Sequence, residues 1–366
     1  MRIQPSTKAG YLFAILCLGL SSYSSAQEAT PEVQPDIHVL VNMVQLNVAV
    51  TDGKGNYITG LRPEDFEVTE DGIAEKLAVF AEGHESIAMP IEPVQPAGMT
   101  MLESKAGKPS LVEPPALASA DPQTLGSLVA GANVFILFDT SNYMYRGFVY
   151  AQDAISDFVR SLETADRIAF YSYSRNLYRA APLTSDRSRI LRAVRTTVAG
   201  DDAALYNTLL LTLKDAARYA GKKVVVVFSN GPDSYSVVPP EDVAELAQSV
   251  GVSVYMISTQ QAKLEPVSTA VFERMTAATG GKAYFAKTWR DEKKAFASIR
   301  DDLGHLYSLN YYPQANPNRG WRTIKVRLVG ERLKKYQVRT RDGYRIQQSA
   351  QLQNSAANAT DLGDAQ

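Results

Sequence analysis

Short apolar runs separated by helix-like stretches dominate the middle of the chain. Between residues 130 and 303, Val134 to Phe138 and most of Lys222 to Ser229 are apolar. Strands that are buried on both faces of a parallel sheet have this continuous character. The stretches between such runs carry apolar residues three or four positions apart, which is typical of helices that cover a sheet. The alternation predicts an α/β fold with a doubly wound, mostly parallel sheet.

The same pattern gives approximate positions for each element. A Ser185-Asp186 pair before Ile190, Leu191 and Val194 is a typical helix start. We expect strands at residues 134–138, 166–174, 222–229, 252–258 and 282–286, and helices at 145–162, 185–198, 205–219, 241–250, 266–279 and 291–303.

Period-two alternation flanks this central region on both sides. Val44, Leu46, Val48 and Val50 alternate with other residues, and residues 37–85 contain two tight-turn sequences with glycine. Residues 304–347 return to the same pattern. We therefore expect a small β unit at 37–85 and a C-terminal β segment at 304–347, which pack together or on their neighbours.

Two segments lack regular periodicity. Residues 86–128 contain seven prolines and predict a linker or long insertion. Residues 348–366 are rich in Gln, Ala, Asn and Ser and predict a disordered tail.

The N-terminus has the order of a secretory signal. Residues 1–26 contain two basic residues, an apolar run from Tyr11 to Leu20, and small residues ending at Ala26. The run has about half of the ~20 residues that a membrane span requires, and no second apolar segment is long enough to span a bilayer. The only cysteine, Cys17, lies within it, so the exported chain contains no disulfide. We expect export to the periplasm, the envelope or the medium, with no transmembrane segment after signal removal.

Charge gives no indication of a polyanionic partner. The formal net charge is −1, which argues against binding nucleic acid. Residues 319–345 are locally basic, but alternation of Lys325 and Arg327 with apolar residues is also expected for the solvent face of amphipathic strands.

Polar residues gather where three of the predicted elements begin or end. Phe138 leads into Asp139, Thr140 and Ser141, and Phe228 leads into Ser229 and Asn230. Between them, Gly200 to Leu210 opens a helix. Ligands bind doubly wound sheets at the carboxyl ends of strands, so these loops are the candidate site.

These motifs resemble the von Willebrand factor A-type domain, and the whole chain resembles the bacterial VWFA-related group. The resemblance includes "LRPEDFEVTEDG" before the central region and "YSLNYYP", "IKVRL" and "RDGY" after it. Such domains usually bind one Mg²⁺ or Mn²⁺ through Asp-x-Ser-x-Ser, a Thr and an Asp on three loops. A partner carboxylate then completes the octahedral oxygen shell that Mg²⁺ prefers.

Residue by residue, the resemblance transfers only part of this metal site. Asp139 and Ser141 match the first two ligands, whereas Tyr143 replaces the second Ser. Ala203 stands at the Thr position and Asn230 at the Asp position. Because two hydroxyls and one carboxylate are lost, we expect a degenerate adhesion site with weak or absent Mg²⁺ or Mn²⁺ binding, and no other cofactor.

Two interpretations of the remaining residues stay open. In the first, Asp139 and Ser141 serve loop structure and cap the following helix. In the second, Asp201 or Asp202 and Asp233 supply acidic oxygens to a rebuilt metal site.

Motifs for catalysis are missing. The sequence has no nucleophile elbow, phosphate loop or dinucleotide fingerprint, and His38, His84 and His305 lie in no metal-ligand spacing. An envelope hydrolase built on Asp139 and Asp233 is the remaining enzymatic alternative.

Aromatic residues beside the predicted metal loop suggest another use for it. We expect Tyr143 and Tyr145 to point outward as partner-binding residues and Phe148 to point inward. The sequence thus predicts an exported, non-enzymatic protein–protein interaction module, with a metal-dependent adhesion module as the alternative.

Overall fold

The computed structural model describes residues 43–83, 85–88, 131–163, 166–230, 232–259 and 266–346. All of them belong to one compact unit that begins at Val41. The predicted signal peptide, most of the predicted linker, and the predicted tail lie outside the described residues. Among the described helices, none combines the length and the apolar character needed to cross a membrane.

A six-stranded sheet forms the centre of the α/β part, and its order is β11-β10-β9-β6-β7-β8. All neighbouring strands are parallel except β8, which runs antiparallel to β7. The strands are β6 (Ala132–Asp139), β7 (Arg167–Tyr173), β8 (Leu177–Thr184), β9 (Lys222–Phe228), β10 (Val252–Thr259) and β11 (Ala283–Ala286).

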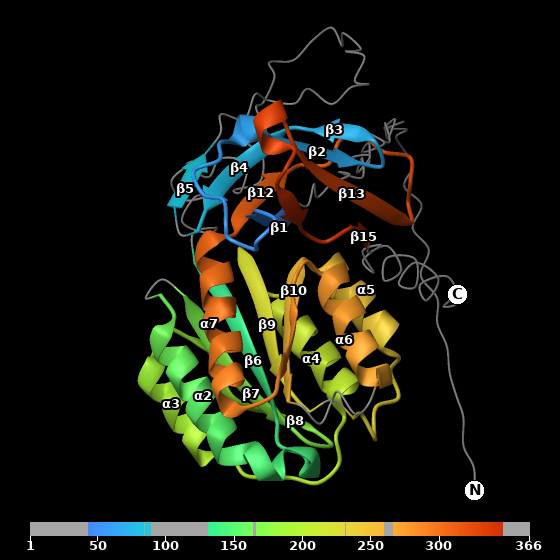
Figure 1. Ribbon diagram of the computed structural model, residues 1–366. Coiled ribbons are helices and arrows are strands. Elements are labelled where there is room, and N and C mark those ends of the chain that lie inside the picture. The colour runs from blue at the N-terminus through green and yellow to red at the C-terminus, as the bar shows by residue number, and fades with distance from the viewer. Residues whose placement is uncertain are drawn as a thin grey trace, which may run out of the picture. The chain divides into compact units, whose positions relative to one another are not determined.

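Helices cover both faces of this sheet. As Figure 1 shows, α2, α3 and α7 lie over one face and α4, α5 and α6 over the other. Alternate residues of each strand pack into the two cores: Ile136 and Phe138 face one, and Phe135 and Leu137 face the other. The helices are α2 (Phe148–Ser161), α3 (Arg187–Thr196), α4 (Leu205–Ala216), α5 (Pro240–Ser249), α6 (Pro266–Ala278) and α7 (Trp289–His305).

The predicted fold class is confirmed, with two local differences. The edge strand β8 was not predicted, because its residues are largely exposed and show no continuous apolar run. The first helix was expected from Tyr145, but a 3-10 turn, η2 (Asn142–Gly147), precedes α2. Asp186 caps α3 as expected, since its side chain accepts a hydrogen bond from the backbone N–H of Arg189.

The β segments before and after the α/β part form two shared sheets. Their orders are β14-β1-β12-β4-β5 and β15-β13-β2-β3, so each sheet contains strands from both ends of the chain. The α/β part is therefore an insertion between β5 and β12 of a single β unit. The strands are β1 (Val44–Thr51), β2 (Phe66–Glu70), β3 (Ile73–Glu75), β4 (Leu77–Glu82), β5 (Glu85–Ala88), β12 (Tyr307–Tyr311), β13 (Trp321–Leu328), β14 (Gln337–Arg339) and β15 (Gly343–Arg345), with 3-10 turns η1 (Pro63–Asp65) and η4 (Glu331–Leu333).

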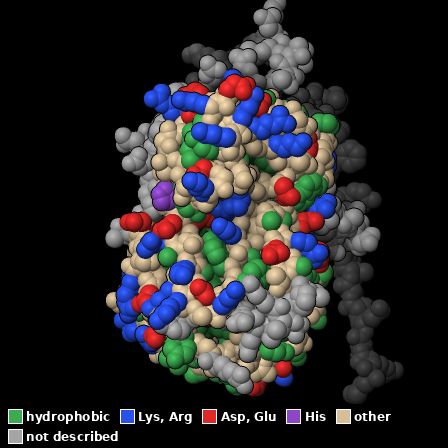
Figure 2. Space-filling model, in the orientation of Figure 1, with side chains coloured by type: hydrophobic (Ala, Val, Ile, Leu, Met, Phe, Trp, Pro, Cys, Tyr) green, Lys and Arg blue, Asp and Glu red, His purple; other side chains and the backbone are tan. Residues whose placement is uncertain are grey.

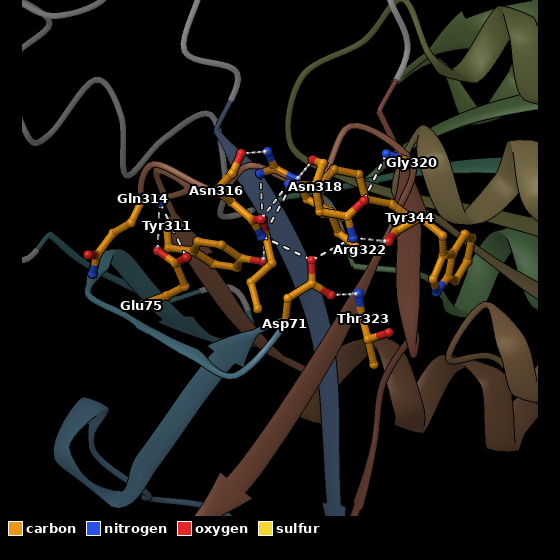
Figure 3. Close-up of polar contacts among 12 residues, drawn as sticks. Asp71, Glu75, Tyr311, Gln314, Asn316, Asn318, Gly320, Arg322, Thr323 and Tyr344 are labelled. Carbon is orange, nitrogen blue, oxygen red and sulfur yellow. Dashed lines mark hydrogen bonds and ion pairs between the residues drawn. The ribbon is translucent and has the colours of Figure 1, made fainter.

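A buried polar network joins the two halves of this β unit (Figure 3). The Glu70 carboxylate accepts hydrogen bonds from the hydroxyls of Tyr311, at 2.8 Å, and Tyr344, at 3.0 Å. Arg322 donates to the same carboxylate at 2.6 Å. The adjacent Asp71 accepts from the backbone N–H of Thr323 at 2.8 Å. Glu70 and Asp71 of the N-terminal Glu-Asp-Gly motif thus bind residues of the C-terminal segment.

Polar contacts also connect the β unit to the amino-terminal ends of the central strands. Lys222, which is buried at the start of β9, donates to the carbonyl of Gly83 at 3.0 Å. Asn47 of β1 donates to Ser253 of β10 at 3.1 Å. Arg339 of β14 makes two hydrogen bonds to Asp302 of α7. These contacts occupy one end of the sheet and leave the loops at the carboxyl ends of its strands uncovered by the β unit.

Candidate functional site

The candidate site lies where β6 and β9 end and the loops toward α2, α4 and α5 begin. Asn142 N–H donates to the carbonyl of Asp201 at 2.7 Å, and Gly200 N–H donates to the carbonyl of Thr140 at 2.7 Å. Asn230 donates a side-chain hydrogen bond to the carbonyl of Tyr143. Loops that are distant in the sequence are thereby held together at one edge of the sheet, as the parallel topology requires.

Asp139 is fully buried at the centre of this edge. One carboxylate oxygen accepts from the backbone N–H of Ser141 at 2.8 Å, and the other accepts from the hydroxyl of Ser229 at 2.7 Å. Burial raises the pKa of Asp139, while the hydrogen bonds oppose that rise. Both oxygens are thus engaged by groups of the chain itself.

Two buried hydroxyls, those of Ser141 and Tyr173, lie near the Asp139 carboxylate but make no hydrogen bond of standard geometry to any described residue. Tyr173 is paired with Asp139 across β6 and β7, and burial raises the pKa of its phenol. Ser141 occupies the N-cap position of η2, but its side chain makes no cap hydrogen bond. The expectation that Ser141 caps the following helix is therefore wrong; the loop is held by Asp139 instead.

The remaining predicted ligand positions, Ala203 and Asn230, take part in contacts between loops. Ala203 is buried and presents no side-chain oxygen, while its carbonyl accepts from the backbone N–H groups of Ser234 and Tyr235. Asn230 uses its amide N–H₂ group to bind the Tyr143 carbonyl. Each position is used to fasten one loop to another.

The acidic residues proposed for a rebuilt site are engaged elsewhere. Asp202 forms an ion pair with Arg175 on the β7–β8 hairpin. Asp233 accepts backbone hydrogen bonds from Tyr206 at 2.9 Å, Tyr235 at 3.1 Å and Ser236 at 2.8 Å. Because Tyr206 belongs to the first turn of α4, Asp233 stabilises the start of that helix.

These positions do not fit an octahedral Mg²⁺ site in the observed arrangement. Such a site needs several oxygens that point to one centre at about 2.1 Å. Asp139 is enclosed, Asp202 and Asp233 bind other groups, and Ala203 has no side-chain oxygen to offer. Across the described residues, no group of three or more His, Cys, Asp or Glu side chains is placed to hold a metal ion.

Aromatic side chains are exposed along the same edge. Tyr143 and Tyr145 are 37% and 52% exposed, as predicted, and Phe148 packs inward against Phe138 with ring centroids 5.3 Å apart. The Tyr145 hydroxyl donates to the carbonyl of Gly200 at 2.8 Å, which fixes its ring over the loop. Tyr235, on the loop after β9, is also 52% exposed.

Several residues of this edge were not found by sequence reasoning. Ser229 was noted at the end of its predicted strand, but its hydrogen bond to Asp139 depends on the pairing of β6 with β9. Tyr173 and Tyr235 carried no motif at all. Arg175 lies 5.1 Å from the ring centroid of Tyr235, in addition to its ion pair with Asp202. For Arg175, the only signal in the sequence was the presence of a basic residue in the turn after a predicted strand.

The central region also matches a known family model. Residues 133–298 match the model of the von Willebrand factor type A domain. These residues are a von Willebrand factor type A domain. The match covers the central sheet and its helices, and the edge described above is the A-domain edge at which Asp139 and Ser141 were aligned with the family's metal ligands.

Solved structures with similarity to the chain are distant. BatB from Bacteroides thetaiotaomicron is 14% identical with a TM-score of 0.39, covering 47% of this chain and 98% of that one. The vWF domain of the type V pili tip protein Mfa5 from Porphyromonas gingivalis is 12% identical with a TM-score of 0.42, covering 47% and 95%. A von Willebrand factor type A protein from Catenulispora acidiphila is 12% identical with a TM-score of 0.40, covering 61% and 68%. No curated protein matches the chain.

Proposed function

We propose that the protein is an exported, non-enzymatic interaction module that binds a protein partner through the loop edge of its A domain without a metal ion. The observation that carries this proposal is the state of Asp139. Its side chain is fully buried, and both of its oxygens accept hydrogen bonds from the chain itself. A buried carboxylate whose two oxygens already accept hydrogen bonds from the chain is poorly placed to bind a metal that a partner could share.

The contact surface would be the aromatic edge, defined as Tyr143, Tyr145 and Tyr235. Tyrosine rings supply large contact areas at low entropic cost and are enriched among residues that dominate binding energy. Arg175 packs beside Tyr235 and is held by Asp202, so a cation is positioned at the border of the edge. The loops are tied together by backbone hydrogen bonds, which favours a preorganised surface.

A metal-dependent form of the same module is the second candidate. It is favoured by Ser141, whose buried hydroxyl lies next to Asp139 without a hydrogen-bond partner of standard geometry. A hydrolase has less support, because Asp139 is closed to substrate and Asp233 is used to hold α4.

Affinity capture from an envelope extract of the source organism tests the proposal. The bait is the mature chain, residues 27–366, in wild-type form and as Tyr143→Ser/Tyr145→Ser. Tyr178→Ser, at an exposed tyrosine of β8, is the matched control. We expect proteins that are retained by the wild type and by Tyr178→Ser, with or without EDTA, but lost from the double variant. Loss of the same proteins on adding EDTA would support the metal-dependent candidate, and equal capture by all variants would contradict the proposed surface.

A further inference from the structure

A groove lies where the chain crosses from one sheet of the β unit to the other. It has a volume of about 560 Å³ and is lined on one wall by Ile324 and Val326 of β13. Residues 338–342, at the end of β14 and beyond it, line the opposite wall, and Ala277 and Ala283 of the A domain line the base. The groove thus combines apolar residues of β13 with polar and charged residues, among them Glu273, Lys282 and Arg339, and it is bordered by two strands.

One border of the groove is an incompletely paired strand. β15 pairs with β13 only from Trp321 to Thr323, while β13 continues to Leu328 with β2 on its other side. The Ile324 N–H donates to the carbonyl of Asp342 at 2.9 Å, so its peptide group points away from β2. Peptide groups alternate in direction along a strand. Those of Val326 and Leu328 therefore point to the same side, where the described residues supply no further strand.

The opposite wall also contains unsatisfied polar atoms. In the described part of the chain, Arg341 Nε and Thr340 Oγ1 are buried without a hydrogen-bond partner. β14 pairs with β1 along one edge, and its other edge faces the groove. Unpaired strand edges bind extended peptides readily, because the backbone supplies the hydrogen bonds and the alternating side chains supply the selectivity.

Charge on β13 indicates what kind of peptide would bind. Lys325 and Arg327 are exposed on the outer face of β13, opposite Thr69 and Glu67 of β2. Figure 2 shows Lys and Arg side chains interspersed with Asp and Glu over the β-rich part of this face. On the open side, an added strand would place its outward residues beside both cations, where opposite charges are stabilising. Its inward residues would contact Ile324 and Val326.

We propose that the β13 edge from Ile324 to Leu328 binds an extended peptide of a partner protein, with alternating acidic and apolar residues, as an added β-strand. The site lies in the β unit, and it does not depend on the aromatic edge of the A domain. The apolar residues of the bound peptide enter the groove between β13 and β14, and the acidic residues of the peptide pair with Lys325 and Arg327.

Fluorescence anisotropy with a defined probe tests this proposal. The probe is fluorescein-labelled Gly-Glu-Val-Glu-Val-Glu-Val-Gly-amide, titrated with mature chain. We expect saturable binding below about 1 mM, which Val326→Pro weakens at least about tenfold by removing the N–H that faces the groove. Lys325→Glu/Arg327→Glu should weaken binding at least about fivefold, while the control Lys214→Glu/Arg218→Glu, at exposed cations of α4 and the turn after it, should not.

Two further probes separate backbone pairing from simple charge attraction. A version N-methylated at its three valines keeps every side chain but loses the donors that face β13, and it should bind at least about tenfold more weakly. A version with Lys in place of Glu should also lose binding. Thermal melting establishes that each protein variant is folded. Absence of binding at about 1 mM, or equal binding by all folded variants or by the N-methylated probe, would overturn the proposal.

Discussion

Arg322 of β13 donates a 2.6 Å hydrogen bond to Glu70 of β2, and both side chains are buried. The two residues are 252 positions apart, with the entire A domain between them. Tyr311 and Tyr344 donate to the other oxygen of the same carboxylate. This pairing makes the two ends of the described chain into one β unit and fixes the A domain at both of its ends.

Removing Arg322 should therefore destabilise the β unit strongly. Arg322→Met leaves Glu70 buried without its cation, so we expect a loss of about 3–5 kcal/mol in the free energy of unfolding by urea. Arg345→Ala, which breaks the exposed ion pair with Glu245, should cost at most about 1 kcal/mol and is the matched control. Equal losses for both variants would show that the buried pair has no special role.

Stability should fall as the pH rises from about 5 to 7, in part through Glu75. Burial raises the pKa of Glu75 from 4.5 to about 7, with the Gln314 backbone N–H opposing the rise and the nearby Glu70 adding to it. The folded state then binds the proton more tightly than the unfolded state. The contribution is present below pH 4.5 and is lost as pH rises through 7. Burial also raises the pKa of Glu292 to about 7, so Glu292 contributes to the same fall in stability as the pH rises.

Glu75→Gln isolates this contribution, because the amide oxygen still accepts from Gln314. Urea unfolding at pH 5 and pH 8 should show a smaller decrease for the variant, by about 1–3 kcal/mol. An identical pH dependence for variant and wild type would contradict the assignment to Glu75.

Two glycines should respond in opposite ways to alanine. A Cβ at Gly281 would lie 1.9 Å from the carbonyl oxygen of Val254, so Gly281→Ala should cost about 2 kcal/mol or more. A Cβ at Gly304, near the end of α7, meets nothing within 4 Å. Gly304→Ala should stabilise the protein by about 0.5–1 kcal/mol. Thermal melting of both variants checks the difference in sign.

The centre of the sheet could be predicted because β6 and β9 are buried on both faces and consist largely of apolar residues. Strand β8 could not, since it is an edge strand whose Tyr178 and Arg179 are exposed. The shared β unit was also beyond prediction in detail. Alternation identifies which face of a strand is buried, but it does not identify the partner strand, and Glu70 and Arg322 meet only through that pairing.

The candidate site was predicted in position but not in its internal contacts. Asp139 and Asn230 could be placed at one edge because parallel strands end there together. The bond of Ser229 to Asp139 and the placement of Tyr173 depend on strand register, which the sequence does not specify. Likewise, Asp233 acquires its role only because the loop after β9 folds back onto the start of α4.

Calorimetric titration of Mg²⁺ and Mn²⁺ into residues 27–366, beside Asp139→Ala, tests the central claim most directly. If the loop edge functions without a metal, neither ion should give saturable heat up to several millimolar, and the wild type and the variant should behave alike. Saturable binding in the micromolar to low-millimolar range that is abolished by Asp139→Ala would contradict the account. The A domain would then be a metal-dependent adhesion module, and its partner would be expected to contribute a carboxylate.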